Sequence, residues 1–325
     1  MKNKKILVVG GAGYIGSHVN RTLLDKGYKT TVFDNLSSGT EDNIFSDTDF
    51  VKGDLLNYSE IESTLKKNFD AVIHLASYKA AGESMIEPEK YSENNIIGAI
   101  NLFNAVSKAG IKNIIFSSSA AVYGNPKYLP INEKHPTKPV NYYGFTKLEI
   151  ERILGWYDKL KDIKFASLRY FNAVGYDVNG KVKGLEKNPA NLFPVIMEVA
   201  IGKRKQLEIY GNDYDTDDGT GVRDYIHVND LASAHILALE YVQNSRKSLT
   251  VNLASEQGIS VQQMLDATRE ITKKSIPAKI VQRRPGDPAK LIASSKKARE
   301  ILGWETKYSD LNNMIKTTWE VYKNL

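Results

Sequence analysis

A tyrosine and a lysine four residues apart are the side chains in this sequence best suited to proton transfer. Residues 141–147 read NYYGFTK. Side chains four apart on a helix lie on one face, so Tyr143 and Lys147 are neighbours and Tyr142 points elsewhere. A free tyrosine has a pKa of about 10, and a nearby ammonium lowers it. We therefore expect Tyr143 to accept a proton from an alcohol hydroxyl, although the spacing alone also fits a surface tyrosine and a solvated lysine.

A cluster of serines precedes this pair by about two dozen residues. Residues 117–124 read SSSAAVYG and follow an apolar run that predicts a strand. The ends of parallel strands face the ligand crevice of such sheets. We expect Ser119 to hold the reacting oxygen and to pass a proton between it and Tyr143. Ser117 and Ser118 are alternatives, and each serine could equally be structural.

A glycine-rich turn near the N-terminus predicts a dinucleotide site. Gly10, Gly13 and Gly16 lie in GGAGYIG, directly after an apolar run and at the start of a helical pattern. Glycines there let backbone N–H groups approach a pyrophosphate at the helix N-terminus. Asp34 ends the second predicted strand, where a carboxylate accepts hydrogen bonds from ribose hydroxyls and repels a 2′-phosphate. The sequence thus favours NAD over NADP, with Asp54 placed to meet the adenine.

The elements that must position these residues alternate between strand and helix. This alternation predicts an α/β fold, a Rossmann-type doubly wound parallel sheet with a smaller C-terminal α/β lobe. We expect residues 1–174 plus about 224–250 to form the dinucleotide domain, and about 175–223 plus 251–325 to form the lobe. A strand–helix unit at 224–243 is assigned to the large sheet, and 255–325 to short helices and loops. The expected strands are 5–9, 30–33, 71–75, 113–117 and 164–168, and the long helices 86–109 and 143–160.

Composition narrows the class of protein. The 325 residues are 42% hydrophobic and 25% charged, and no apolar run approaches the length that spans a membrane. The basic N-terminus lacks a cleavage region after its apolar run, which argues against a signal peptide. There is no cysteine, and the net charge of +6 comes from scattered lysines. We expect a cytoplasmic protein without a metal site that binds neither nucleic acid nor membrane.

The glycine turn, the serine cluster and Y-x-x-x-K together resemble the extended short-chain dehydrogenase/reductases. Within them the chain resembles the UDP-glucose 4-epimerase family from residue 10 to 287. The stretches that carry this are GGAGYIGSHV, DNLSSG, KAAGES, SSSAAVYGNP, RYFNAVG, YGNDYDTDDGTGVRDYIHVNDLA and RRPGD. The resemblance implies a Rossmann domain with a substrate lobe, NAD held throughout the cycle, a UDP-sugar substrate, and a homodimer formed through helices at 87–110 and 141–161.

The resemblance also implies a reaction and a set of site residues. Tyr143 would remove the proton of the sugar 4-hydroxyl while NAD takes hydride from carbon 4. The 4-keto sugar would then rotate and take the hydride back on its other face. The implied catalytic residues are Tyr143, Lys147 and Ser119. The implied cofactor residues are Gly10, Gly13, Tyr14, Ile15, Gly16, Asp34, Asn35, Asp54, Leu55, Leu75, Ala76, Lys79, Asn94, Ser117, Tyr143, Lys147 and Tyr170. The implied substrate residues are Ser119, Tyr143, Asn172, Asn191, Leu192, Tyr210, Arg223, Arg284, Asp287 and Leu291.

Three departures from the family pattern bear on these expectations. Ser77 stands where the family usually has glycine or alanine, near the cofactor. Asn141-Tyr142 replace a Ser-Pro and bear on where the catalytic helix starts. Leu291 occupies a position at which sugar-strict members carry a large aromatic side chain. The smaller leucine favours acceptance of N-acetylhexosamines as well as hexoses.

Two other functions share part of this pattern. A sugar-nucleotide dehydratase or decarboxylase has the same fold and tyrosine–lysine pair. However, dehydratases resemble a Thr-Asp-Glu pattern where this chain has Ser119-Ala120-Ala121, so dehydration lacks its carboxylate. A non-catalytic NAD-binding or RNA-binding relative would often lack Tyr143 or Lys147, and both are present.

Overall fold

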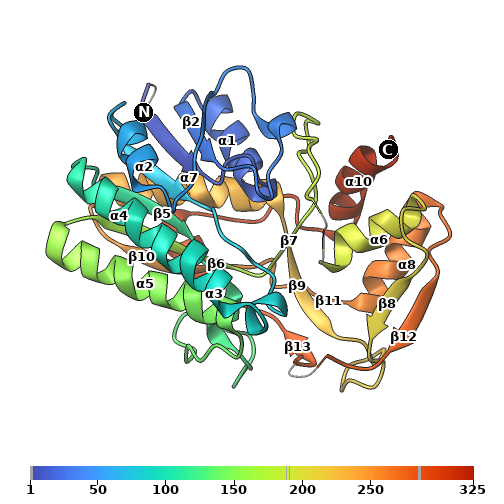
Figure 1. Cartoon of the computed structure of the whole chain (residues 1–325). Helices are drawn as coiled ribbons and strands as arrows, with labels where there is room; N and C mark the ends of the chain where they lie inside the picture. Colours follow the sequence, from blue (N-terminus) through green and yellow to red (C-terminus); the bar gives the residue numbers. More distant parts are fainter. Residues whose placement is uncertain (1–2, 188, 190, 285–286) are drawn as a thin grey trace.

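The centre of the protein is a parallel sheet of seven strands (Figure 1). A computed structural model describes residues 3–187, 189, 191–284 and 287–325. The strand order reverses between β1 and β4, and ligands of such sheets bind at the strand carboxyl ends at this point. In order across the sheet the strands are β3 (Asp49–Lys52), β2 (Lys29–Asp34), β1 (Lys5–Val9), β4 (Ala71–His74), β5 (Asn113–Ser117), β6 (Lys164–Tyr170) and β10 (Leu249–Leu253).

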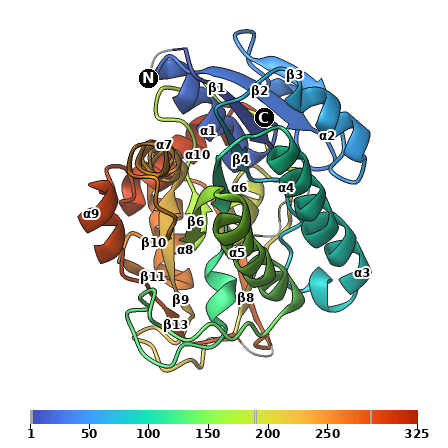
Figure 2. The same ribbon diagram turned by 90° about the vertical axis from the view of Figure 1, so that its left-hand side faces the viewer.

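Helices cover both faces of this sheet, which confirms the predicted doubly wound α/β fold. One face carries α1 (Tyr14–Asp25), α7 (Val228–Ser245) and α9 (Lys296–Leu302). The other carries α2 (Tyr58–Leu65), α4 (Gly98–Lys108) and α5 (Tyr142–Lys161). Figure 2 shows α4 and α5 side by side.

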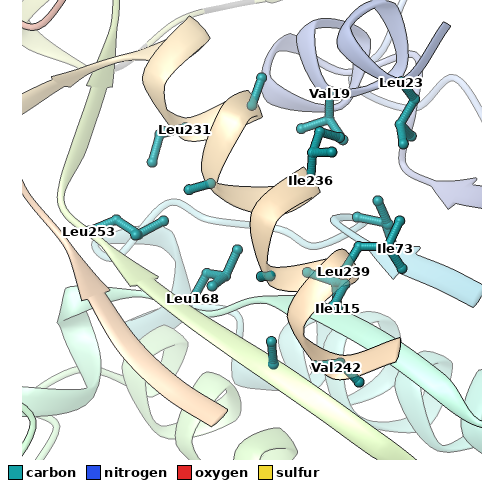
Figure 3. Close-up of a cluster of buried hydrophobic side chains, with 14 of the residues drawn as sticks. Val19, Leu23, Ile73, Ile115, Leu168, Leu231, Ile236, Leu239, Val242 and Leu253 are labelled. Atoms are coloured by element: carbon teal, nitrogen blue, oxygen red, sulfur yellow. The ribbon is translucent and has the colours of Figure 1, made fainter. Parts of the chain in front are cut away.

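Helix α7 packs its apolar face between α1 and the sheet, as Figure 3 shows. Fully burying one such aliphatic side chain stabilises a fold by about 1.5–3 kcal/mol, so this layer stabilises the sheet together with the helices packed on it. The labelled side chains of the layer are Val19, Leu23, Ile73, Ile115, Leu168, Leu231, Ile236, Leu239, Val242 and Leu253.

A smaller lobe faces the carboxyl ends of the central strands (Figure 1). It contains two small sheets and three helices around its own apolar cluster. One sheet is built from β7 (Asn172–Val174), β9 (Val222–His227), β11 (Gly258–Ser260) and β13 (Lys290–Leu291), and the other from β8 (Leu207–Tyr210) and β12 (Ala278–Val281). The helices are α6 (Leu192–Ala200), α8 (Val261–Thr272) and α10 (Leu311–Tyr322). No helix in the described part of the chain is long and apolar enough to cross a membrane.

Two predictions about strands are wrong. The strand of the 224–243 unit, β9, belongs to the lobe's sheet, and only its helix α7 covers the large sheet; the seventh central strand is β10. Buried Asp224 holds β9 in the lobe, since its carboxylate accepts hydrogen bonds from the backbone N–H groups of Ser255 and Glu256. Residues 255–325 contain β11, β12 and β13 besides helices, and strands of two to four residues leave almost no periodic pattern.

The helix predicted at 86–109 has three parts. It begins as α3 (Pro88–Tyr91), continues as a π-helical segment at Ser92–Ile97, and ends as α4. Such π turns are frequent at functional sites because they re-aim side chains without ending the helix. The segment contains Asn94, a predicted cofactor residue. The division of the chain into two domains stays a prediction, with β10 crossing the boundary expected near residue 250.

Candidate active site

The glycine turn after β1 has the backbone that a dinucleotide requires. Gly10 has a φ of +82°, and a Cβ on it would lie 2.5 Å from the backbone nitrogen of Ala76. A Cβ on Gly16 would collide with the carbonyl oxygen of Gly10. Helix α1 starts at Tyr14, and its N-cap Gly13 supplies no side-chain acceptor for the first turn. The close-packed glycines and the uncapped helix end suit a bound pyrophosphate.

Asp34 lies at the end of β2 beside this turn. Its carboxylate accepts hydrogen bonds from the N–H groups of Ala12, at 3.0 Å, and Leu36, at 2.8 Å. Burial raises the pKa of Asp34, and these two bonds act in the opposite direction. Asn35 donates to Asp54 across 2.9 Å, so the predicted ribose and adenine residues are linked to each other. These contacts fix the Asp34 carboxylate beside the glycine turn, as the prediction of a ribose-binding residue requires.

One cavity extends from this turn to the end of β5. Of the predicted cofactor residues, all but Ser117 line it, and so do the departure Ser77 and the predicted substrate residues Asn172 and Asn191. The predicted lining residues are Gly10, Gly13, Tyr14, Ile15, Gly16, Asp34, Asn35, Asp54, Leu55, Leu75, Ala76, Lys79, Asn94, Ser119, Tyr143, Lys147, Tyr170, Asn172 and Asn191.

A glutamate that the sequence did not single out also lines this cavity. Glu186 lies 2.5 Å from the ammonium of Lys79, a predicted cofactor residue. Nearby, Lys187 donates to the carbonyl of Leu36, and Gly184 donates to Asn43. The segment around Glu186 is therefore tied to the dinucleotide half at three points. No local motif marks such a residue, because its role depends on a partner more than 100 positions away.

Tyr143 and Lys147 lie on one face of α5 at the inner end of the cavity. The Lys147 ammonium is 5.8 Å from the centre of the Tyr143 ring and donates to the carbonyl of Ser117 at 2.9 Å. Burial lowers the pKa of Lys147 to about 7, against the opposing charge of Glu151. Burial also raises the pKa of Tyr143, while a hydrogen bond with Ser119 acts to lower it. The predicted lowering of the Tyr143 pKa by the protein's own groups is therefore wrong. Burial disfavours the charged phenolate, and this effect is the largest one on Tyr143.

The three serines after β5 point in different directions. Ser119 lines the cavity, and its hydroxyl caps the following turn by accepting from the N–H of Ala121 at 3.1 Å. The buried hydroxyl of Ser117 bonds to His235 at 2.9 Å, and that of Ser118 donates to Glu151 at 2.5 Å. The structure therefore brings Ser119 to Tyr143. Ser117 meets the site through its carbonyl, which accepts from Lys147, and through a side-chain hydrogen bond with Tyr170.

The departures before the catalytic helix have clear structural roles. Asn141 is the N-cap of α5, with its side-chain oxygen accepting from the N–H of Gly144 at 2.8 Å. The Tyr142 hydroxyl bonds to Ser92 at 2.6 Å, on the side of α3. The Ser77 hydroxyl donates to the carbonyl of Tyr78. Helix α5 therefore includes both Tyr143 and Lys147, as their shared face requires.

A second cavity in the lobe meets the first and shares with it Asn172, Ala173 and Asn191. The guanidinium of Arg284 stacks 3.9 Å from the centre of the Tyr210 ring. The predicted substrate residues along this cavity are Asn172, Asn191, Leu192, Tyr210, Arg223, Arg284 and Asp287. Pro285 and Gly286 of the RRPGD motif lie outside the described residues.

Leu291 is the predicted substrate residue that neither of these two cavities includes among its walls. It is half-buried in β13, opposite Arg223 of β9, and packs on the apolar cluster that contains Tyr123. The influence of Leu291 on a ligand would therefore act through its neighbours.

Known proteins resemble the whole chain. Residues 6–254 match the NAD dependent epimerase/dehydratase family. The UDP-glucose 4-epimerase of Lacticaseibacillus casei is 45% identical, over 98% of this chain and 97% of its own. The solved UDP-glucose 4-epimerase of Brucella ovis, in complex with NAD, is 42% identical with a TM-score of 0.94 over 97% of each chain. The UDP-Glc/GlcNAc 4-epimerase of Campylobacter jejuni is 36% identical with a TM-score of 0.87, over 99% of this chain and 100% of its own. This chain belongs to the NAD dependent epimerase/dehydratase family.

Proposed function

We propose that this chain is an NAD-dependent UDP-glucose 4-epimerase, an isomerase that interconverts UDP-glucose and UDP-galactose. One observation carries the proposal: Tyr143, Lys147 and Ser119 lie in the cavity that runs from the glycine turn, next to a second cavity whose walls include three arginines. The curated relatives bear this enzyme's name, and the Brucella ovis structure contains NAD. A dehydratase is disfavoured, since Ala120 and Ala121 follow Ser119 where that reaction would use carboxylates.

Tyr143, Ser119 and Lys147 each have a separate role in the proposed reaction at carbon 4 of the sugar. NAD, when bound along the first cavity, would supply the group that accepts the hydride and returns it. Tyr143 takes the proton from the 4-hydroxyl and later gives it back, and Ser119 holds the oxygen between these steps. The Lys147 ammonium, 5.8 Å from the ring, favours the phenolate form of Tyr143 and so acts against the effect of burial.

The lobe's residues would hold the rest of the substrate. Arg223 and Arg284 suit a diphosphate, since a guanidinium donates two parallel hydrogen bonds to such oxygens. Asp287, 3.5 Å from Arg223, would accept from ribose hydroxyls. Tyr210 offers an aromatic face to uracil. Because Leu291 is smaller than an aromatic residue, we extend the proposal to UDP-N-acetylhexosamines. The similar Campylobacter jejuni protein is a UDP-Glc/GlcNAc 4-epimerase.

The proposed assembly is a homodimer in the cytoplasm. Large apolar side chains are exposed just before α3 and along α5: Ile86 is 80% exposed, Trp156 58% and Leu160 67%. Monomers rarely expose so much apolar surface on neighbouring helices, and a second copy would cover it. We also retain the proposed division into a dinucleotide domain and a substrate lobe.

The test offers UDP-galactose and UDP-N-acetylgalactosamine to the purified protein in parallel, with the products identified by mass and chromatography. The proposal predicts UDP-glucose from the first and UDP-N-acetylglucosamine from the second. A product lighter by one water would identify a dehydratase. No conversion of either sugar by protein that carries NAD would refute the proposed function.

A further inference from the structure

We propose that Glu151 is a positioning residue for the reaction: with Arg169 it holds the serine segment against helix α5, and it places a negative charge one helical turn from the Lys147 ammonium. This inference rests on the proposed function, since it gives Glu151 a role in the same active site. Glu151 touches neither cavity among their described walls, so its effect on the reaction would pass through Lys147 and the serines.

The geometry links two turns of α5 to two consecutive residues of the strand end. Glu151 follows Lys147 by four positions and so lies on the same helix face. Lys147 donates to the carbonyl of Ser117 at 2.9 Å, and Ser118 donates to Glu151 at 2.5 Å. These two bonds fix the backbone that leads directly into Ser119. A shift of α5 relative to β5 would therefore break both bonds and separate Ser119 from Tyr143.

A buried guanidinium completes the arrangement. Arg169 on β6 donates to both carboxylate oxygens of Glu151, at 2.9 and 2.5 Å. Its third nitrogen donates to the Tyr123 hydroxyl at 3.0 Å, and Tyr123 donates to Asn252 of β10. Glu151 is 8% exposed and Arg169 7%. A buried ion pair is often no more stable than an apolar replacement, so stability alone is a weak reason for this one.

The negative charge of Glu151 stabilises the ammonium of Lys147, which burial destabilises. Burial favours the neutral amine of Lys147, and Glu151 opposes this. Neutral histidines surround the site, since burial lowers the pKa of His74 to about 3 and of His235 to about 4. Among the titratable groups near Lys147 that the structure describes, Glu151 is the one that carries a negative charge. The groups are Tyr143 and Glu151 on α5, His74 on β4, Arg169 and Tyr170 on β6, and His235 on α7.

The test compares variants that break the same ion pair with opposite charge changes. Glu151→Gln removes the negative charge and keeps the side-chain shape, whereas Arg169→Gln removes the positive charge. The measurement is the pH dependence of kcat for UDP-galactose, using the NAD-loaded protein. The basic limb of this profile is the part in which kcat falls as the pH rises. We expect the basic limb to move about one pH unit lower in Glu151→Gln, because Lys147 loses its proton more easily. The limb should move higher in Arg169→Gln. Glu149→Gln, on the same helix but paired with Arg152 at the surface, should leave it in place.

Several results would overturn the proposal. Movement of the basic limb in the same direction in both variants would show that structural damage, and not charge, causes the effect. If Glu151→Gln does not fold, the double variant Glu151→Gln/Arg169→Gln removes both charges, and the two expected movements oppose each other. A basic limb that moves as far up in the double variant as in Arg169→Gln alone would refute the charge role of Glu151. Titration of Lys147 by nitrogen-15 NMR in the NAD-loaded protein reads its pKa without turnover. An inactive wild type with a lowered Lys147 pKa in Glu151→Gln would contradict the proposed function but not this link.

Discussion

Replacing Tyr143 and Tyr142 separately by phenylalanine should divide catalysis from stability within two adjacent residues. Each substitution removes one hydroxyl and leaves the ring in place. The Tyr143 side chain lines the cavity beside Ser119, whereas Tyr142 is not among the described cavity walls and its hydroxyl bonds to Ser92 at 2.6 Å. The two variants therefore probe different surroundings of the same helix turn.

The structure sets different magnitudes for the two changes. A positioned general base contributes about 10²–10⁴-fold, so Tyr143→Phe should raise the barrier by about 3–5 kcal/mol. Loss of the Tyr142–Ser92 hydrogen bond should cost about 0.5–1.5 kcal/mol of folding stability. Tyr142→Phe should leave kcat within about twofold, since Tyr142 is not among the described cavity walls.

The assay measures kcat with UDP-galactose and the free energy of unfolding in urea for both variants and the wild type. We expect Tyr143→Phe to lose activity yet keep bound NAD and nearly all of its stability. Tyr142→Phe should show the converse. A larger loss of kcat in Tyr142→Phe than in Tyr143→Phe would refute the assignment of the base.

Three further predictions concern the cofactor, the substrate and the effect of acid. Because the Asp34 carboxylate would repel a 2′-phosphate, mass analysis of cofactor extracted from the purified protein should find NAD, and recovery of NADP would contradict this. Leu291→Tyr should lower kcat/KM far more for UDP-N-acetylglucosamine than for UDP-glucose by crowding the N-acetyl group; equal losses would exclude Leu291 as the residue that sets substrate breadth. Four histidines have a pKa lowered by burial from about 6.5, so the stability present above that pH should be lost as the pH falls toward 3–4, by about 1.4 kcal/mol for each unit of depression. Asp224, whose pKa is raised to about 6, opposes this loss, and a melting temperature that stays constant from about pH 7 to 4.5 would contradict the expected net effect. The four are His18, with a pKa of about 4, His74 and His227, with pKa values of about 3, and His235, with a pKa of about 4.

The features that the sequence predicts well are those set by local pattern. The shared face of Tyr143 and Lys147 follows from helical spacing, and the turn at Gly10 follows from glycines between a strand and a helix. The sheet to which β9 belongs could not be predicted in this way. Its apolar run indicates burial, but its pairing with β7 and β11 depends on residues far away in the chain.

The pKa of the catalytic groups also lies outside local pattern. An ammonium four residues away predicts a lowered pKa for Tyr143, whereas burial by strands and helices from several parts of the chain raises it. Glu151 and Glu186 were missed for the same reason. The sequence around a single glutamate does not indicate its partner. Glu151 pairs with the buried Arg169, and Glu186 pairs with Lys79.

The most direct test of the account follows a deuterium atom on carbon 4 of UDP-galactose. If that hydrogen leaves carbon 4 as hydride and returns inside the same closed site, with Tyr143 moving only the hydroxyl proton, the UDP-glucose formed should keep the deuterium in ordinary water. Mass spectrometry and proton NMR of the product measure this retention. Replacement of the deuterium by solvent hydrogen would show that carbon 4 loses a proton instead, and would contradict the proposed mechanism.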